Sequence, residues 1–283
     1  MMRSLLFIPA DSEKKLAKGL DSKADALVLD LEDAVLPDRK PIARELMRDW
    51  MGQQTDHSRL WVRVNDLDSG EMLNDLPAVV ASRPAGILLP KVRAAADVTA
   101  VGHYLEVLEA EHGLQAGQIR IMALVTETPQ AMLRMNDLLD QGHPRVSHIT
   151  WGGEDLSSAL GAGDPRDETG AWRPLYQQAR NQCLLLGHAM GCEVLDTVYV
   201  DFKNPEGLAA SCIQSRHDGF TGRIAIHPNQ VDIINQAFTP TQAERDLAQK
   251  IIDAFASGAG AVSIDGKMYD IPHLKAARRL LAS

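Results

Sequence analysis

One pattern recurs eight times in this chain: a short apolar run followed by a segment with helical periodicity. Most of the runs are apolar at nearly every position, which is typical of strands covered on both faces, as in a parallel sheet. The runs are Ser4 to Ile8, Ala26 to Leu31, Leu60 to Val64, Gly86 to Leu89, Arg120 to Val125, Ser147 to Trp151, Val194 to Val200 and Ile224 to His227.

The intervening segments predict eight helices, so strand and helix alternate along about 240 residues. The expected helices are Glu13 to Ser22, Pro41 to Met51, Gly70 to Ala81, Ala94 to Glu111, Pro129 to Gln141, Pro174 to Met190, Asn204 to Arg216 and Val231 to Phe238. The chain contains neither a GxGxxG dinucleotide motif nor a P-loop. Eight βα units without these motifs favour an α/β fold of the (β/α)₈ TIM barrel type over an open doubly wound sheet.

The last stretch, residues 241–283, breaks the pattern. It predicts a helix from Thr241 to Ala256, a glycine-rich turn, a short strand, a polar loop and a final basic helix. Its apolar strings "AVSI" and "LLA" require burial, so we expect it to pack on its own barrel or on a neighbouring subunit. The chain is therefore divided into a catalytic barrel, 1–240, and a C-terminal extension, 241–283.

Composition narrows the class of protein. The 283 residues are 45% hydrophobic with a formal net charge of −9, and no block of like charge indicates a nucleic-acid or membrane-surface partner. The three cysteines show no metal-ligand spacing, which predicts reduced thiols and a cytoplasmic location. The N-terminal apolar run is too short for a signal peptide, and no run reaches membrane-spanning length.

Charged residues gather where the apolar runs end. A TIM barrel places its active site at the C-terminal ends of its strands. Glu127 and Asp155 follow consecutive strands, and two carboxylates without a nearby His or Cys suit a hard cation such as Mg²⁺. Arg63 and Lys91 follow earlier strands and could hold the oxygens of an anionic substrate in the same mouth.

Each of these residues also has a purely structural interpretation. Asp155 could cap a helix, and Lys91 could be a solvated charge on the rim. Arg63 could pair with a carboxylate of the string "DLED", which contains Asp30, Glu32 and Asp33. His227, before a proline, is more often a structural histidine than a catalyst. The concentration of charge on one face of the barrel favours a functional site over separate caps.

Eight strings in order along nearly the whole chain carry a family resemblance. They are "RSLLFIPA", "LVLDLEDAV", "VRVN", "LPKV", "ETP", "GGEDL", "GFTGRIAIHPNQ" and "DGKMYDIP". The chain closely resembles the citrate lyase β-subunit-like proteins of the HpcH/HpaI aldolase superfamily, which includes malyl-CoA and citramalyl-CoA lyases. The resemblance implies a Mg²⁺-dependent TIM barrel that assembles as a homotrimer, or a hexamer, and binds a small keto or hydroxy acid and an acyl-CoA thioester.

The resemblance also assigns roles by position. Glu127 and Asp155 match the metal ligands, Arg63 matches the arginine on the substrate oxygens, and Asp270 matches an acid/base that reaches a neighbouring subunit's site. The residues expected around the metal are Glu32, Asp33 and Lys91. Gly153 and Glu154 are expected to contact the substrate beside Glu127. Phe7 and Lys18 are expected to contact coenzyme A. The glycines of "GGEDL" would bring backbone amides to the substrate carboxylate.

These roles predict a lyase that cleaves a carbon–carbon bond of a malyl-CoA-like or citramalyl-CoA-like thioester and releases a keto acid. Hydrolysis of the same thioester needs the same metal ligands and is a second possibility, and a non-catalytic metabolite-binding barrel is a third. Ala10 and Ser12 stand where the acyl-CoA lyases usually have glycine and arginine, which leaves the acyl carrier open between coenzyme A, a carrier protein and none. Arg223 replaces the more usual lysine.

Overall fold

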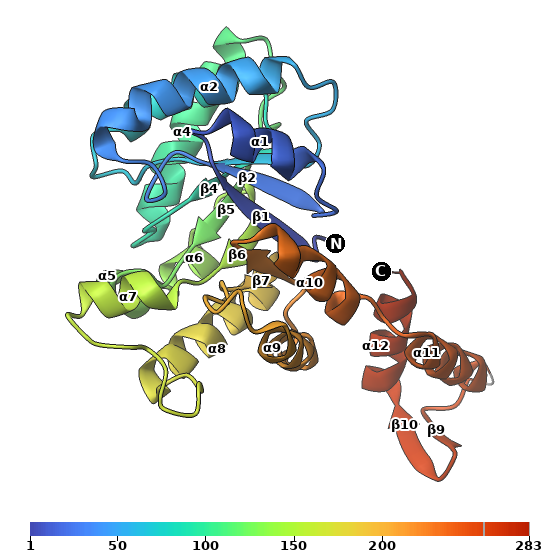
Figure 1. Cartoon of the computed structure of the whole chain (residues 1–283). Coiled ribbons are helices and arrows are strands. Elements are labelled where there is room, and N and C mark those ends of the chain that lie inside the picture. The colour runs from blue at the N-terminus through green and yellow to red at the C-terminus, as the bar shows by residue number, and fades with distance from the viewer. Residues whose placement is uncertain (257, 283) are drawn as a thin grey trace.

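The computed structural model describes residues 1–256 and 258–282, so Ser257 and Ser283 of the expected extension lie outside the described residues. Eight parallel strands pair in sequence order, and β1 closes the circle by pairing with β8. The strands are β1 (Ser4–Pro9), β2 (Ala26–Asp30), β3 (Leu60–Arg63), β4 (Gly86–Leu89), β5 (Arg120–Leu124), β6 (Val146–Thr150), β7 (Glu193–Asp196) and β8 (Gly222–Ala225). The predicted (β/α)₈ barrel is confirmed (Figure 1).

Helices surround the barrel (Figure 1). In chain order they are α1 (Glu13–Leu20), α2 (Lys40–Gly52), α3 (Met72–Ala81), α4 (Ala95–Glu111), α5 (Pro129–Arg134), α6 (Asp137–Asp140), α7 (Gly153–Ala159), α8 (Pro174–Ala189), α9 (Pro205–Asp218) and α10 (Val231–Phe238), with 3₁₀ turns η1 (Pro37–Arg39) and η2 (Pro228–Gln230). No helix in the described part of the chain is both long and apolar enough to cross a lipid bilayer.

Two apolar clusters share the strands because successive side chains point to opposite faces of a sheet. On β2, Leu27 and Leu29 belong to the large cluster that includes the helices, whereas Val28 belongs to a small cluster inside the barrel. Trp61 on β3 also belongs to the inner cluster. The next positions of the same parity are Asp30 and Arg63, so the alternation that fills the barrel also turns these charged side chains into its C-terminal mouth.

Several boundaries differ from those expected. The expected helix from Pro129 to Gln141 is interrupted after Arg134 and continues as the short α6. The seventh strand ends at Asp196, although the apolar run continues to Val200. A short helix that is absent from the expected set, α7, begins at the second of the two glycines, Gly153.

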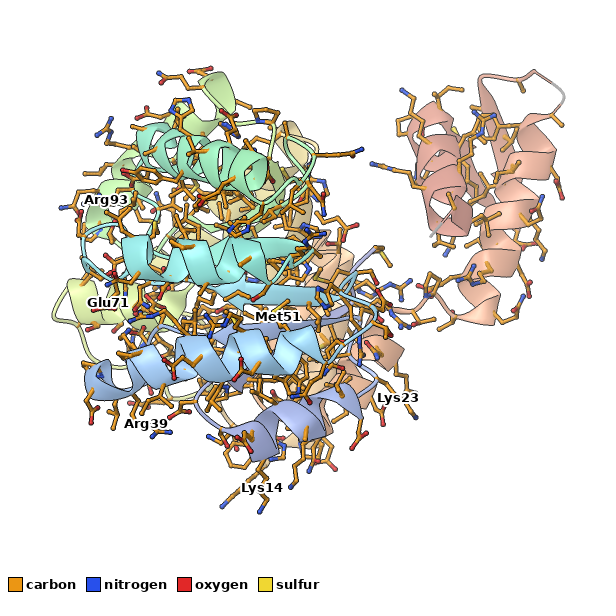
Figure 2. The ribbon with its side chains drawn as sticks, turned by 90° about the horizontal axis from the view of Figure 1, so that it is seen from above. Lys14, Lys23, Arg39, Met51, Glu71 and Arg93 are labelled. Carbon is orange, nitrogen blue, oxygen red and sulfur yellow. The ribbon has the colours of Figure 1, made fainter. Side chains whose placement is uncertain are left out.

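The C-terminal extension forms a unit with its own small core. It contains α11 (Gln242–Phe255), β9 (Ala261–Ile264), β10 (Lys267–Asp270) and α12 (Ile271–Ala282). The two strands pair as an antiparallel hairpin, so the expected polar loop is in fact largely a strand. The unit projects from the barrel in both views (Figures 1 and 2). At its base, Arg216 Nη2 of α9 contacts Glu244 Oε1 of α11 at 2.9 Å.

Candidate active site

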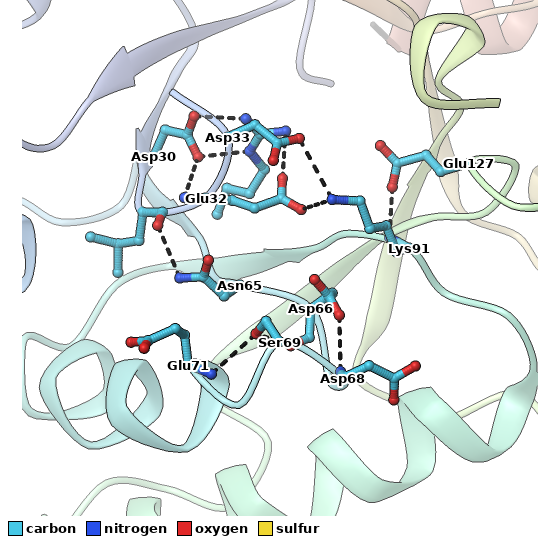
Figure 3. A network of polar contacts seen from close by, with 12 residues as sticks. Asp30, Glu32, Asp33, Asn65, Asp66, Asp68, Ser69, Glu71, Lys91 and Glu127 are labelled. Atoms are coloured by element: carbon cyan, nitrogen blue, oxygen red, sulfur yellow. Dashed lines mark hydrogen bonds and ion pairs between the residues drawn. The ribbon is translucent and has the colours of Figure 1, made fainter. Parts of the chain in front are cut away.

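Arg63 is fixed at the barrel mouth by two carboxylates, Asp30 and Glu32, both of which are labelled in Figure 3. Its Nε and Nη2 donate to the two oxygens of Asp30 at 2.7 and 2.6 Å. Its Nη1 lies 2.9 Å from Glu32 Oε2. The nearby negative charges raise the pKa of Arg63 further above its usual value, although burial opposes them. Of the five N–H donors of the guanidinium, two donate to Asp30 and one faces Glu32 Oε2 in an ion pair without a hydrogen bond, so two N–H groups are left for a ligand.

Lys91 connects two carboxylates of the mouth through different groups. Its backbone N–H donates to Glu127 Oε2 at 2.6 Å, and its Nζ donates to Glu32 Oε1 at 2.7 Å. Asp33 Oδ2 lies 3.6 Å from the same Nζ. Lys91 has a φ of +53°, a left-handed conformation that costs a non-glycine residue free energy and is common at functional sites. The conformation places the Lys91 N–H at Glu127.

Glu127 is 2% exposed, and burial raises its pKa well above the usual value. The negative charges of Asp155 and Glu32 raise the pKa further. Gly152 allows this carboxylate its position, because a Cβ on Gly152 would lie 3.1 Å from Glu127 Cγ and 3.3 Å from Oε1. The carboxylate of Glu127 therefore lies in a buried site between the ends of β5 and β6.

The charges of the mouth do not balance. We use mouth cluster for Asp30, Glu32, Asp33, Arg63, Lys91, Glu127 and Asp155, which are five carboxylates and two cationic groups. The described residues contain no group of three or more His, Cys, Asp and Glu side chains placed to hold a metal ion. Two carboxylates nevertheless suit Mg²⁺, which commonly keeps several water ligands. Burial and the charge of Asp155 raise the pKa of Glu127, which fits two carboxylates that would hold a cation.

Gly152 provides a direct test of how closely Glu127 must be placed. Gly152→Ala adds a methyl group 3.1 Å from Glu127 Cγ, so the carboxylate has to move by a few tenths of an ångström. We expect turnover to fall by roughly tenfold with little loss of stability, because small misplacements of reacting groups are costly. The control is Gly163→Ala, where an added Cβ meets nothing within 4 Å. Equal turnover in both variants would show that the position of Glu127 is not critical.

Two of the other predicted residues lie beside the mouth cluster. The guanidinium carbon of Arg63 lies 4.7 Å from the centre of the Phe7 ring. Phe7 and Lys18 line one cavity of about 510 Å³, together with the turn that contains His227 and Pro228. The structure thus brings the residues expected at coenzyme A next to those expected at the substrate.

The backbone amide of Gly152 has a partner within the protein. Its N–H donates to Thr126 Oγ1 at 3.0 Å, whereas the sequence placed it on a substrate carboxylate. Gly153 is needed for packing: an added Cβ would lie 2.9 Å from the Trp172 ring. Glu154 is exposed on α7, and partial desolvation of its carboxyl group raises its pKa.

Asp270 is not brought to the mouth of its own barrel. It lies on β10 in the projecting extension, about half exposed, and its Oδ1 is 2.5 Å from His273 Nδ1. This hydrogen bond lowers the pKa of Asp270 below its usual value. Asp270 can therefore meet a mouth cluster only if the extension reaches another subunit.

The structural interpretations are correct for some residues. Arg63 does pair with Asp30 and Glu32, and the sequence did not identify Asp30 as the bidentate partner. His227 caps a 3₁₀ turn, because its Nδ1 accepts from the Asn229 N–H at 3.2 Å. Side-chain direction alternates along β2 and points Asp30 inward with Val28, and this period-2 alternation was the signal that could have identified Asp30.

Two relatives match the chain over nearly its full length. It is 36% identical to a (3S)-malyl-CoA thioesterase of Cereibacter sphaeroides, over 99% of this chain and 93% of that protein. It is 32% identical to the citrate lyase subunit beta of Haemophilus influenzae, over 99% of this chain and 96% of the relative.

Solved structures agree with this relationship. The crystal structure of CitE from Mycobacterium tuberculosis in complex with magnesium, acetoacetate and coenzyme A superposes with a TM-score of 0.84 at 30% identity, covering 99% of this chain and 97% of that one. The HpcH/HpaI aldolase/citrate lyase family model matches residues 3–228, which is most of the chain. The chain therefore belongs to the HpcH/HpaI aldolase/citrate lyase family.

Proposed function

We propose that this protein is a Mg²⁺-dependent carbon–carbon lyase of the cytoplasm. Its substrate would be a small hydroxyacyl thioester of the malyl-CoA type, and its products a keto acid and an acyl thioester. The unbalanced negative charge around Glu127 is the observation that carries the proposal. The ligands in the CitE structures, magnesium with acetoacetate and coenzyme A in one and magnesium with pyruvate in another, support the substrate class.

Glu127 and Asp155 would hold the metal ion. Bound there, Mg²⁺ would supply a Lewis acid that polarises the hydroxyl and carboxylate oxygens of the substrate. Lys91 would fix one oxygen of Glu127 through its backbone N–H, which leaves the other oxygen for the ion. Glu32 and Asp33 would lie around the ligands and keep the ammonium group of Lys91 in place.

Arg63 would bind the substrate oxygens with the two N–H groups that Asp30 and Glu32 leave free. The paired carboxylates fix the plane of the guanidinium, so binding costs little further ordering. As the carbon–carbon bond breaks, the hydroxyl proton would pass to water and the bonding electron pair to the thioester fragment, which leaves as an enolate. Arg63 would stabilise the keto acid oxygen that forms at the same time.

Asp270 would then take up a proton from water and pass it to the enolate carbon, which completes the acyl thioester. Because Asp270 lies in the projecting extension, we propose that residues 241–283 pack on a neighbouring subunit of a homotrimer and complete its site. The extension has its own core, built around Ile251, Phe255 and Leu274, which allows it to keep its shape when it docks as a unit.

Thioester hydrolysis is the second candidate function, because a relative at 36% identity is named a (3S)-malyl-CoA thioesterase. In this reaction water adds to the thioester carbonyl, the carbon–sulfur bond breaks, and free coenzyme A and malate form. The same carboxylates would hold the metal ion, and Asp270 would act as the base that takes the proton from water.

Product analysis separates the two reactions. We would incubate the protein with (3S)-malyl-CoA and Mg²⁺ and measure glyoxylate, acetyl-CoA and free thiol. The lyase proposal predicts glyoxylate and acetyl-CoA in equal amounts with no free thiol. Free thiol with malate and no glyoxylate would establish the hydrolase instead. No Mg²⁺-dependent product from malyl-CoA or citramalyl-CoA would contradict both.

Subunit mixing tests the role of Asp270. We expect Asp270→Asn to lose turnover and to retain binding of the keto acid, because the mouth cluster is unchanged. When this variant is mixed with Glu127→Ala protein, hybrid trimers would contain sites with an intact Glu127 and an intact Asp270 from different subunits. Partial recovery of turnover is the expected result. Mass spectrometry would verify that the subunits have exchanged. If turnover then does not recover, Asp270 lies outside the site.

A further inference from the structure

A second polar cavity lies away from the mouth cluster, between α8, α9 and the loop 162–173 that precedes α8. Its volume is about 500 Å³, which is within the usual range for small-molecule sites. Three arginines line it, Arg166, Arg180 and Arg223, together with Asp196. None of the seven residues of the mouth cluster lines this cavity.

Arg223 is the most deeply buried of the three arginines, with 1% of its surface exposed. Its Nη2 donates to Asp196 Oδ2 at 2.8 Å, and its Nη1 donates to Ser211 Oγ at 2.8 Å. Its Nε is buried and has no hydrogen-bond partner within residues 1–256 and 258–282. A buried donor without a partner costs free energy, so an acceptor at this position would be stabilising.

Arg166 lies across the cavity on the loop. Its Nη1 donates to the Gly170 carbonyl at 2.8 Å, and its guanidinium carbon lies 3.6 Å from the centre of the Trp172 ring. In the described part of the chain, no carboxylate lies within ion-pair distance of Arg166. Burial, and then the positive charge of Arg223, lower the pKa of Arg166. Glu154 and Asp196 act on Arg166 only through longer-range charge, which favours its charged form.

The fixed charges of the cavity are not neutral. Arg180 contacts Asp196 Oδ2 at 3.2 Å and Asp218 Oδ2 at 2.7 Å, and Arg223 shares Asp196. Among the side chains that line the cavity, three guanidinium groups therefore meet one carboxylate, Asp196, while Asp218 and Glu154 act on Arg180 and Arg166 from outside the lining. The neutral side chains of Gln177, Gln214 and Ser211 also line the cavity and can donate hydrogen bonds.

We propose that this cavity binds a small oxyanion, a phosphate or a carboxylate group, between Arg166 and Arg223. We call it the α8/α9 pocket. Arginine is the side chain best suited to such groups because its planar fork offers paired donors. The pocket is larger than a phosphate ion, so its natural ligand would carry the oxyanion on a small organic body. The proposal is independent of the reaction at the barrel mouth.

Anion titration tests the proposal. We would titrate the intact protein with inorganic phosphate and, separately, with succinate, in the absence of divalent metal so that the mouth cluster does not retain the anion. Calorimetry gives the affinity, and a change in tryptophan fluorescence that is lost in Trp172→Phe places the anion in the pocket, which Trp172 lines. Saturable binding is expected for at least one anion, and the tighter of the two identifies the preferred group. Weak, non-saturable binding would indicate an adventitious ion only and would overturn the proposal.

Two pairs of variants locate the binding. Arg166→Gln should weaken it roughly tenfold or more, because a charged hydrogen-bonding partner is lost. Arg173→Gln, on the same loop but outside the pocket lining, should leave the affinity unchanged. Ala210 is exposed on α9 and lines the pocket, so Ala210→Glu should supply a competing carboxylate and abolish binding, whereas the isosteric Ala210→Gln should weaken it less.

The matched variants also define the contrary results. Equal affinity in wild type and Arg166→Gln would place the anion elsewhere on the protein. Equal affinity in Ala210→Glu and wild type would do the same without altering any arginine. Thermal unfolding in the absence of anion checks that each variant is folded. None of these readouts depends on turnover, so failure here leaves the proposed function unaffected.

Discussion

Glu127→Gln should lose Mg²⁺-dependent turnover by roughly a hundredfold or more while the protein stays folded. Replacing even an outer partner of a metal ligand typically costs ten- to a hundredfold, and Glu127 is proposed as a ligand itself. Glutamine keeps the shape of the side chain and an oxygen for the Lys91 N–H. It removes a buried negative charge that Asp155 and Glu32 repel. We therefore expect the melting temperature to stay unchanged or to rise.

The matched control is Glu193→Gln at the other end of the barrel. Glu193 opens β7, and its Oε2 accepts from the Met2 N–H at 2.7 Å, far from the proposed chemistry. We expect the control to retain turnover. Steady-state kinetics and thermal unfolding of both variants provide the test. Full turnover in Glu127→Gln would remove Glu127 from the metal site.

Asp196→Asn should destabilise the protein more than any substitution at the mouth. Asp196 is fully buried and accepts from Arg223, from Arg180 and from Trp151 Nε1, the last at 2.6 Å. Asparagine keeps the size of the side chain but removes the negative charge that pairs with two buried guanidinium groups. Breaking a buried ion pair by removing one partner costs about 3–5 kcal/mol. Urea unfolding measures this loss directly.

Asp218→Asn is the control for the same arginine. Asp218 Oδ2 contacts Arg180 Nη1 at 2.7 Å, but its side chain is 36% exposed. Water replaces much of a lost contact at such a position, so we expect a change of about 1 kcal/mol or less. Equal losses in the two variants would mean that burial does not set the strength of the Asp196 network.

The same network predicts how stability depends on pH. Arg223 and Arg180 hold the pKa of Asp196 well below its usual range, in spite of burial, which acts in the opposite direction. A carboxyl whose pKa is lower in the folded state stabilises the fold above its unfolded pKa of about 4. The contribution is lost as the pH falls below that value. Asp196→Asn should therefore show a weaker loss of stability between about pH 5 and pH 2 than wild type.

The sequence was sufficient for the barrel because each strand is apolar on both faces and each helix has its own period. It also located the mouth, since a barrel gathers the residues that follow its strands. Glu127, Arg63 and Lys91 do lie together. The way they lie could not be read from the sequence: the positive φ of Lys91, which aims its N–H at Glu127, depends on tertiary contacts and not on local propensity.

Other features were missed because their partners are distant in sequence. Asp196 and Arg180 belong to different βα units, and the pairing of β7 with β8 places Asp196 beside Arg223. Gly152 was expected to free its amide for a substrate, yet the hydroxyl of Thr126, on the preceding strand end, occupies it. The second strand of the extension, β10, is short and polar, with Met268 and Asp270 exposed, so it lacks the alternation that identifies a strand.

The most direct test is the binding of a divalent cation to the mouth cluster, measured without substrate turnover. We would titrate Mn²⁺, as a paramagnetic stand-in for Mg²⁺, into wild type and Asp155→Asn and count bound ions by electron paramagnetic resonance, with and without pyruvate. The account predicts one saturable site per chain, competed by Mg²⁺, tightened by the keto acid and lost in Asp155→Asn. Unchanged Mn²⁺ binding in Asp155→Asn, or no saturable site in wild type, would contradict it.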